Sequence, residues 1–355
     1  MASQIEIQDI NSACEKEIMK SVFGSNILIT GSTGLIGSFY VKCLSNLNKT
    51  QDAGINIYLI VRSIEKATGL FSCLNDSHIH YIEGDICAPV EVDADIDYII
   101  HGASITNSKM MVTKPVETID IAVNGTKNML ELARKQKNLK AFLYMSSLEA
   151  YGVTDPSLYY ISETDYGYID QLSVRSCYSM GKRMVECLCV SYASEYGVPA
   201  KIARLAQTFG AGVQYSDKRV FADFSRCIIE NRNIILHTKG ETVHNYCYLS
   251  DAVTGLTTVL IKGEVSQAYN VANQSTDISI YDMAQMLCDM YPEKNLKVVV
   301  EDADAAKFGY PPANKARLAS AKLEALGWSA TVDLKEMFER LIQDMIYQRQ
   351  GDCEA

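Results

Sequence analysis

The sequence predicts an α/β protein built on a doubly wound parallel sheet of the Rossmann type, with a smaller, interwoven α/β lobe. Two observations predict it: short, continuously apolar runs alternate with longer segments of helical spacing, and a glycine-rich turn follows the first run. Parallel strands covered on both faces have continuous apolar runs of this kind. A chain of 355 residues, 48% of them hydrophobic, is long enough for that core and a second lobe.

The apolar runs give the elements in order. We expect strands over residues 27–29, 57–61, 80–82, 98–100 and 141–145, and helices over 35–47, 123–135 and 178–196. After a sixth strand the alternation loosens into aromatic-rich and turn-rich segments at 207–215, 246–248 and 310–312. We therefore divide the chain into three parts, namely an N-terminal extension (1–23), a dinucleotide-binding domain (24–205, with a returning segment near 246–272) and a substrate-binding lobe (206–245 and 273–348).

Charge and cysteine usage limit the class of protein. A net charge of −10 gives no general attraction to nucleic acids or anionic membranes. No stretch reaches the ~18 uninterrupted apolar residues of a membrane span, and the acidic N-terminal segment is unlike a signal peptide. The 11 cysteines show neither metal-ligand spacing nor a disulfide framework. We expect no metal, no nucleic-acid or membrane partner, and a cytoplasmic location.

A glycine-rich turn joins the first strand to the first helix of the predicted sheet. Its glycines follow the pattern G-x-x-G-x-x-G, in which the first permits a tight turn, the second admits a pyrophosphate and the third allows close helix packing. The N-terminus of the helix adds free N–H groups and the positive end of its dipole. The turn predicts a dinucleotide site, with cofactor contacts at Gly31, Thr33, Gly34, Leu35, Ile36 and Gly37.

The end of the second strand bears on the choice of dinucleotide. An acidic residue there would bind the ribose 2′-hydroxyl of NAD. Arg62 stands in that place and fits the 2′-phosphate of NADP, whereas Glu65 close behind fits NAD. These residues leave NAD and NADP open, and Asp85 and Ile86, just after the third strand, are expected beside the adenine.

Polar side chains follow the fifth strand and open a later helix. Ser147 and Glu149 come at the carboxyl end of the strand, where doubly wound sheets bind ligands. Tyr178 and Lys182 are four residues apart and share one face of a helix. A phenol titrates near pH ~10 in water, and a nearby ammonium group lowers that pKa, so Tyr178 is a candidate base. Ser147 would hydrogen-bond the same substrate oxygen.

A Tyr/Lys pair alone is an ordinary helix face, but the glycine turn, the strand-end serine and Tyr-x-x-x-Lys in this order are far more specific. Together they resemble the extended short-chain dehydrogenase/reductase family, in particular its NAD(P)-dependent nucleotide-sugar epimerases, dehydratases and decarboxylases. The resemblance runs from residue 26 to residue 328. It implies NAD as cofactor, a nucleotide-sugar substrate, a homodimer formed by helices 124–135 and 178–196, and cofactor contacts at Gly102, Ala103, Ser104, Tyr178 and Lys182.

Glu149 discriminates between the reactions that the resemblance implies. The family oxidises C4 of the sugar, and its dehydratases and decarboxylases carry a glutamate at this offset, whereas many 4-epimerases do not. If the strand continues past Ser147, both side chains point the same way. Residues 175–186 resemble the UDP-glucuronate decarboxylase branch most. A decarboxylase-like or dehydratase-like reaction is therefore expected first. The alternatives are a 4-epimerase, an NADPH-dependent keto-sugar reductase motivated by Arg62, and a non-catalytic dinucleotide sensor.

Two departures from the family pattern bear on the substrate. His244 stands where the family has an arginine that contacts the diphosphate or the sugar carboxylate, and Gln207 replaces an asparagine. Neutral histidine is a poorer partner for an anion than guanidinium. Arg204 is a further candidate phosphate partner. The predicted substrate contacts are Ser104, Ser147, Glu149, Gln207, Arg219, His244 and Arg317.

Overall fold

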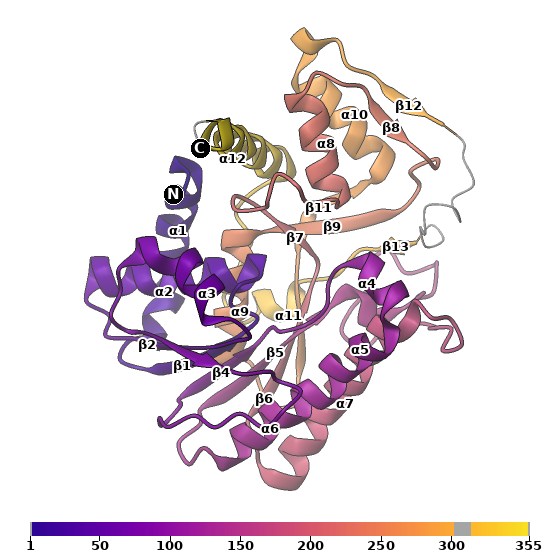
Figure 1. The fold of residues 1–355 in the computed structure, drawn as a ribbon. Coiled ribbons are helices and arrows are strands. Elements are labelled where there is room, and N and C mark those ends of the chain that lie inside the picture. Colours follow the sequence, from indigo (N-terminus) through magenta and orange to yellow (C-terminus); the bar gives the residue numbers. More distant parts are fainter. Residues whose placement is uncertain (1, 302–313, 354–355) are drawn as a thin grey trace.

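A computed structural model describes residues 2–301 and 314–353, and its main feature is a seven-stranded parallel sheet (Figure 1). The strand order is β10-β6-β5-β4-β1-β2-β3, so all five strands that the apolar runs predict are present, and the fold class is confirmed. The strands are β1 (Asn26–Thr30), β2 (Asn56–Val61), β3 (Ile79–Glu83), β4 (Tyr98–His101), β5 (Ala141–Ser147), β6 (Ala200–Leu205) and β10 (Ala268–Val271).

Helices cover both faces of this sheet, which explains why the middle parts of its central strands are apolar. On β1, Ile27 and Ile29 pack into a core with α2 (Leu35–Gln51), α3 (Ile64–Phe71) and α9 (Leu249–Lys262). Leu28 points to the opposite core, which α6 (Thr126–Lys135) and α7 (Ser176–Tyr196) close. Along the second face, α4 (Ser108–Thr113), α5 (Pro115–Asp120) and the π-helical turn η3 (Ile121–Gly125) lead into α6.

The order of the sheet reverses between β1 and β4, since the chain builds β2 and β3 on one side and β4 to β6 on the other. In doubly wound sheets, ligands bind at the carboxyl edge beside such a reversal. Here the loop after β1 meets the loop after β4, because Gly102 N–H donates to Thr30 O at 3.2 Å. The fold therefore assigns the ligand edge independently of any motif.

A second lobe lies beyond this edge and has a core of its own. Its main sheet has the order β11-β9-β13, with β7 paired to β9, and a two-stranded sheet joins β12 to β8. The chain enters this lobe at β7, returns to the first sheet for β10, and then leaves again. The elements are β7 (Gln207–Phe209), α8 (Val220–Ile229), β8 (Ile234–Leu236), β9 (Val243–Tyr248), β11 (Asn273–Ser279), α10 (Ile280–Met290), η5 (Pro292–Lys294), β12 (Val298–Val300), β13 (Lys315–Ala316) and α12 (Leu334–Cys353).

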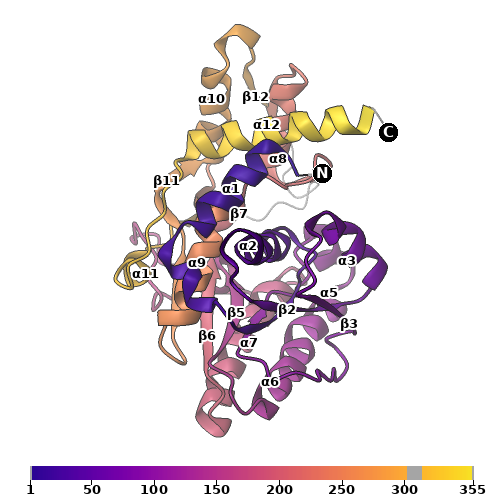
Figure 2. The ribbon, with the colours of Figure 1, turned by 90° about the vertical axis from the view of Figure 1, so that its left-hand side faces the viewer.

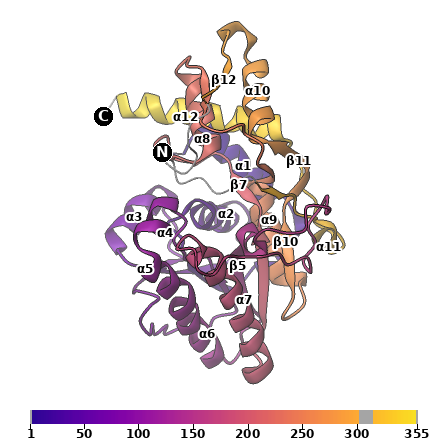
Figure 3. The ribbon, with the colours of Figure 1, turned by 90° about the vertical axis from the view of Figure 1, so that its right-hand side faces the viewer.

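The first and last helices lie side by side. Helix α1 (Gln4–Cys14) runs between α2 and α12, as Figures 2 and 3 show in two views, and η1 (Glu17–Val22) follows it. The short elements η2 (Ser72–Leu74), η4 (Leu148–Tyr151) and α11 (Ala321–Glu324) complete the set. Residues 302–313 of the predicted substrate-binding lobe lie outside the described residues, and the predicted domain boundaries stay predictions. Within the described ranges, no helix is long and apolar enough to cross a membrane.

Candidate active site

The glycine turn after β1 is shaped by close backbone contacts that a side chain would block. Gly31 has a φ of +71°, and a Cβ there would lie 2.7 Å from the amide nitrogen of Ala103. A Cβ at Gly37 would lie 2.3 Å from the carbonyl oxygen of Gly31. Gly34 is the N-cap of α2 and has no side chain to satisfy the N–H groups of the first turn. Thr33 in the turn is exposed.

These features fit a dinucleotide. Bare backbone at a helix N-terminus, with N–H groups free to donate, is what a pyrophosphate needs. Leu35 and Ile36 form the first turn of α2, and Gly102 to Ser104 follow β4 beside the glycine turn. The sequence-predicted contacts at the pyrophosphate side therefore come together at the edge where the sheet order reverses.

The ribose and adenine candidates lie at the next strand ends. Arg62 directly follows β2 and its side chain is exposed. Asp85 follows β3 and accepts the N–H of Cys87 at 2.9 Å, while Ile86 is buried and its carbonyl accepts from Asn128 at 2.8 Å. No acidic residue stands at the end of β2, so Arg62 keeps the question of NADP open.

Tyr178 and Lys182 lie on one face of α7, beside the end of β5. Lys182 Nζ donates to the carbonyl oxygen of Met145 at 2.8 Å and lies 5.6 Å from the centre of the Tyr178 ring and 4.7 Å from that of Tyr144. Tyr178 is 8% exposed and Lys182 is 4% exposed. With Ser147 and Glu149 they form what we call the Tyr178 cluster.

The protonation of this cluster is governed first by burial. Burial raises the pKa of Tyr178 to about 12; the charge of Glu149 also raises it, and a hydrogen bond with Ser147 and the charge of Arg175 act against this. Burial lowers the pKa of Lys182 to about 8. In the protein alone, burial therefore outweighs the lowering of the Tyr178 pKa expected from a nearby ammonium group. The positive charge that favours the phenolate must include that of an oxidised nicotinamide ring.

Glu149 does not continue the strand, contrary to the extended geometry considered for it. β5 ends at Ser147, whose Oγ accepts the N–H of Glu149 at 3.2 Å, and the chain turns into η4. The carboxylate still reaches α7, because Oε1 pairs with Arg175 at 3.0 Å and Oε2 accepts from Ser179 Oγ at 3.2 Å. Ion pair and hydrogen bond together aim Glu149 at the helix that carries Tyr178.

The second lobe brings His244 toward this cluster. His244 is on β9, burial lowers its pKa to about 4, and the charge of Glu149 acts on it in the opposite direction. Gln207 opens β7 and pairs in register with Tyr246 of β9. The side of the site that faces the second lobe therefore presents a neutral imidazole and an amide.

The three arginines predicted to contact phosphate or substrate are all engaged in ion pairs. Arg204 is 1% exposed and donates to both oxygens of Glu186, at 3.0 and 2.7 Å, so that part of the prediction is wrong. Arg219 pairs with Asp217 at 2.7 Å, and Arg317 pairs with Asp277 at 2.8 Å. An incoming phosphate at Arg219 or Arg317 must share the guanidinium with a carboxylate.

Two further residues at the site are absent from the sequence-based set. Arg175 pairs with Glu149, and its position three residues before Tyr178 was the available signal. His101, at the end of β4, is fully buried between Thr30 Oγ1 at 2.7 Å and Thr126 Oγ1 at 2.9 Å. Burial lowers the pKa of His101 to about 3, so its neutral ring fixes the start of the loop that contains Gly102 and Ala103.

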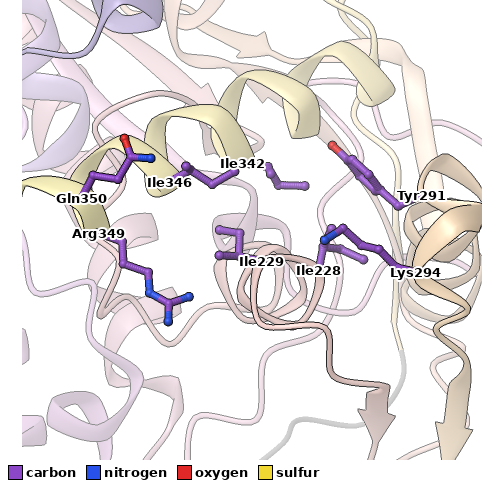
Figure 4. Close-up of a pocket in the computed structure, with 8 residues that line it drawn as sticks. All are labelled: Ile228, Ile229, Tyr291, Lys294, Ile342, Ile346, Arg349 and Gln350. Atoms are coloured by element: carbon purple, nitrogen blue, oxygen red, sulfur yellow. The ribbon is translucent and has the colours of Figure 1, made fainter. Parts of the chain in front are cut away.

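A cavity of about 550 Å³ lies elsewhere, between α8, η5 and α12 (Figure 4). Half of its lining residues are isoleucines, and none of the candidate residues contributes to it. We place the candidate site at the sheet edge because only there do the glycine turn and the Tyr178 cluster meet. The cavity is lined by Ile228, Ile229, Tyr291, Lys294, Ile342, Ile346, Arg349 and Gln350.

Comparison with known sequences identifies the family. Residues 27–272 match the model of the NAD dependent epimerase/dehydratase family. UDP-glucuronic acid decarboxylase 6 of Arabidopsis thaliana is 29% identical over 325 residues, covering 91% of this chain and 90% of the relative. UDP-glucuronic acid decarboxylase 1 of Danio rerio is 27% identical over 319 residues, covering 89% of this chain and 72% of the relative.

Solved structures show the same fold. The UDP-glucose 4-epimerase of Thermotoga maritima, solved with UDP-glucose, has a TM-score of 0.74 at 20% identity and covers 92% of this chain and 99% of its own. A dTDP-glucose 4,6-dehydratase of Streptomyces venezuelae, with NAD bound, has a TM-score of 0.74 at 18% identity over 92% and 98% of the two chains. A UDP-glucuronic acid 4-epimerase of Bacillus cereus, solved with UDP-glucuronic acid and NAD, has a TM-score of 0.73 at 21% identity. The match covers 91% of this chain and 99% of the epimerase chain.

Proposed function

Because this chain belongs to the NAD-dependent epimerase/dehydratase family, we propose that it oxidises C4 of a nucleotide-linked sugar and then acts on the resulting keto sugar. The observation that carries the proposal is the placement of the Tyr178 cluster beside the glycine turn. When bound there, NAD⁺ supplies a hydride acceptor. The bare turn and the first turn of α2 hold its pyrophosphate, and Gly102, Ala103 and Ser104 line the neighbouring loop.

Tyr178 is the proposed base for the oxidation. Its phenolate takes the proton of the C4 hydroxyl, and Ser147 hydrogen-bonds the same oxygen as that oxygen becomes a carbonyl. Lys182 stabilises the phenolate from the same helix face, since its ammonium lies 5.6 Å from the ring centre. Its donation to the carbonyl of Met145 fixes the ammonium in that position.

Glu149 is the proposed second acid/base, which makes a decarboxylase-like or dehydratase-like reaction our first choice. Arg175 and Ser179 hold the Glu149 carboxylate at the carboxyl end of β5, where it can exchange a proton with a carbon next to the new ketone. A carboxylate at C6 is β to a ketone at C4 and leaves as CO₂, with the electron pair passing into an enolate. Protonation of that enolate completes the step. The decarboxylase relatives at 27–29% identity support this choice.

A 4-epimerase is the second candidate, and His244 favours it. A neutral imidazole is a weak partner for a sugar carboxylate, so an uncharged hexose fits that side of the site. Arg62 in turn keeps a net NADPH-dependent reductase as an alternative, and such an enzyme would consume added NADPH in the presence of a 4-keto sugar. The Tyr178 cluster weighs against a non-catalytic sensor, which needs none of those residues.

The predicted dimer helices are 124–135 and 178–196, and we propose a homodimer through α7 and through α5, which leads by way of η3 into α6. Both helices carry exposed apolar side chains, with Val116 78% exposed, Met184 54% and Val190 40%. Val185, next to Met184 in the sequence, is fully buried and belongs to the core. Sedimentation of the wild type and of a Val116→Glu, Met184→Glu double variant tests the proposal. A double variant with an unchanged sedimentation coefficient would contradict it.

The test of the function is a substrate screen followed by NMR of the products. UDP-glucuronate, UDP-glucose, dTDP-glucose and GDP-mannose are each incubated with wild type, Tyr178→Phe and Glu149→Gln. We expect turnover of at least one by wild type, none by Tyr178→Phe, and a keto sugar without final product from Glu149→Gln. Loss of CO₂, loss of water or inversion at C4 identifies the reaction. An absence of any turnover by wild type with all four would contradict the proposal.

A further inference from the structure

Side chains of the C-terminal helix α12 hydrogen-bond the backbone of the loop from β7 to α8 (residues 210–219). Asp344 Oδ2 accepts the N–H of Gly212 at 2.8 Å. Gln348 accepts the N–H of Tyr215 at 2.9 Å and donates to the carbonyl of Val213 at 2.9 Å. Gln348 also donates to Asp344 at 2.8 Å, so the two α12 side chains fix each other as well as the loop.

The N-terminal helix holds the same loop from the other side, through Tyr248. Tyr248 Oη donates to Asp9 Oδ2 at 2.5 Å and accepts the N–H of Ala211 at 3.4 Å. The second oxygen of Asp9 pairs with Arg340 of α12. Asp9 is 0% exposed, so this carboxylate is used entirely within the protein.

The loop also lies against the helix of the glycine turn. Gly212 has a φ of +97°, and a Cβ there would lie 3.3 Å from Glu6 Oε1 and 3.9 Å from Leu35, the first residue of α2. Glu6 pairs with Lys42 of α2, and Ser3 donates to Asp344. Helix α1 therefore joins α2, α12 and the loop into one polar network.

We infer that α1 and α12 form a clasp that positions residues 211–219 for binding the nucleotide end of the substrate, with Asp9 and Asp344 as positioning residues. The inference rests on the proposed function. Gln207 precedes this segment and Arg219 ends it, so a shift of the loop moves two predicted substrate contacts. Buried carboxylates cost free energy unless every lone pair is used, and a network in which they are used fixes one arrangement.

The test compares two substitutions of Asp344 with a control elsewhere. Asp344→Ala leaves the N–H of Gly212 without its acceptor. Asp344→Asn keeps a carbonyl oxygen for that N–H, because the Ser3 hydroxyl can accept from the new amide. Asp251→Ala is the control, since Asp251 is 2% exposed and accepts the N–H groups of Thr331 and Val332, away from the loop. Gln348→Ala is a milder variant in case Asp344→Ala does not fold.

The readouts are UDP binding to the protein as purified, by calorimetry, and hydrogen exchange of the loop amides. We expect Asp344→Ala to weaken UDP binding about tenfold, Gln348→Ala about threefold, and Asp344→Asn and Asp251→Ala less than about twofold. The amides of Ala211, Gly212 and Tyr215 exchange faster in Asp344→Ala and Gln348→Ala only.

Three results would overturn the inference. Equal UDP affinity in wild type, Asp344→Ala and Gln348→Ala refutes the clasp while leaving the proposed function intact. If Asp251→Ala weakens UDP binding as much as Asp344→Ala does, the clasp is also refuted, since loss of stability alone would then account for the weaker binding. Failure of wild type to bind UDP, dTDP or GDP refutes the proposed function, and the inference with it.

Discussion

The Tyr178 cluster and the α1–α12 clasp are both buried polar networks, but they pair their charges differently. Lys182 meets a carbonyl oxygen and two aromatic ring faces, and burial lowers its pKa to about 8. Asp9 meets the guanidinium of Arg340 and the hydroxyl of Tyr248. The difference indicates that Lys182, which has no carboxylate partner in hydrogen-bond contact, is available to act on Tyr178, whereas the ion pair of Asp9 holds the geometry of the loop. Substitutions should therefore affect chemistry in the first network and stability or loop position in the second.

The largest expected effect is that of Tyr178→Phe. Removing the phenol should lower kcat about 10³-fold, within the range of general acid–base catalysis. The unfolding temperature should stay within about 2 °C of wild type, because the substitution removes one hydrogen bond, that with Ser147, and leaves the packing of the ring in place. Steady-state kinetics and calorimetry measure the two quantities, with the content of bound dinucleotide as control. A fall in the unfolding temperature well beyond about 2 °C would show that Tyr178 also supports stability, and the proposed difference from the clasp would then be wrong.

Arg340→Met should have the opposite signature. It leaves Asp9 buried without its ion pair, which should lower the free energy of unfolding by about 3 kcal/mol near neutral pH. Burial raises the pKa of Asp9 from 3.8 to about 6. Protonation of Asp9 therefore favours the folded state, and this contribution is complete below the unfolded pKa and is lost as pH rises through 6.

The loss caused by Arg340→Met should consequently be smaller at about pH 5 than at about pH 7.5, because a protonated Asp9 needs no guanidinium. Urea unfolding at both pH values measures it, with Arg340→Lys as the charge-retaining control. A loss that is the same at both pH values would show that Asp9 is not the group responsible.

Arg175→Met should act on the second step alone. Without its ion pair Glu149 is held only by Ser179, so product formation from the keto sugar should slow about tenfold while reduction of the cofactor stays within about twofold. Rapid-mixing absorbance of the reduced nicotinamide separates the two steps. Equal slowing of both steps would assign Arg175 to the oxidation.

Much of the sheet was predictable because burial on both faces leaves a local signature. Ile27, Leu28 and Ile29 belong to opposite cores yet all are apolar, and the glycine turn is dictated by contacts within and next to itself. Tyr178 and Lys182 share one helix, so their spacing alone placed them together. These signals need no knowledge of distant partners.

The buried charged residues could not be predicted, because their burial depends on partners that are far away in the sequence. Glu6 and Asp9 lie in a segment predicted as an N-terminal extension, but they are 5% and 0% exposed. They can be buried because Lys42 and Arg340 supply the opposite charges. Arg204 was predicted as a phosphate partner, but it is buried, because its partner Glu186 on another element supplies the opposite charge. No local pattern identifies which of several charged residues will be paired and buried.

The smallest expected effect is at the edge of the cofactor site. Arg62 is exposed, so Arg62→Ala should change the affinity for NAD⁺ less than about twofold and weaken that for NADP⁺ about tenfold. Fluorescence titration of protein freed of its dinucleotide measures both. A strong loss of NAD⁺ binding would assign Arg62 to the pyrophosphate instead of the ribose.

The central claim is that hydride leaves C4 of the sugar under control of Tyr178. The most direct measurement uses the substrate that the screen identifies, deuterated at C4, with mass spectrometry of the dinucleotide bound to Glu149→Gln after a single turnover. We predict one deuterium on the nicotinamide, and none when Tyr178→Phe is added to the same variant. Wild-type product formed with no deuterium ever reaching the nicotinamide, or equal transfer with and without Tyr178, would contradict the account.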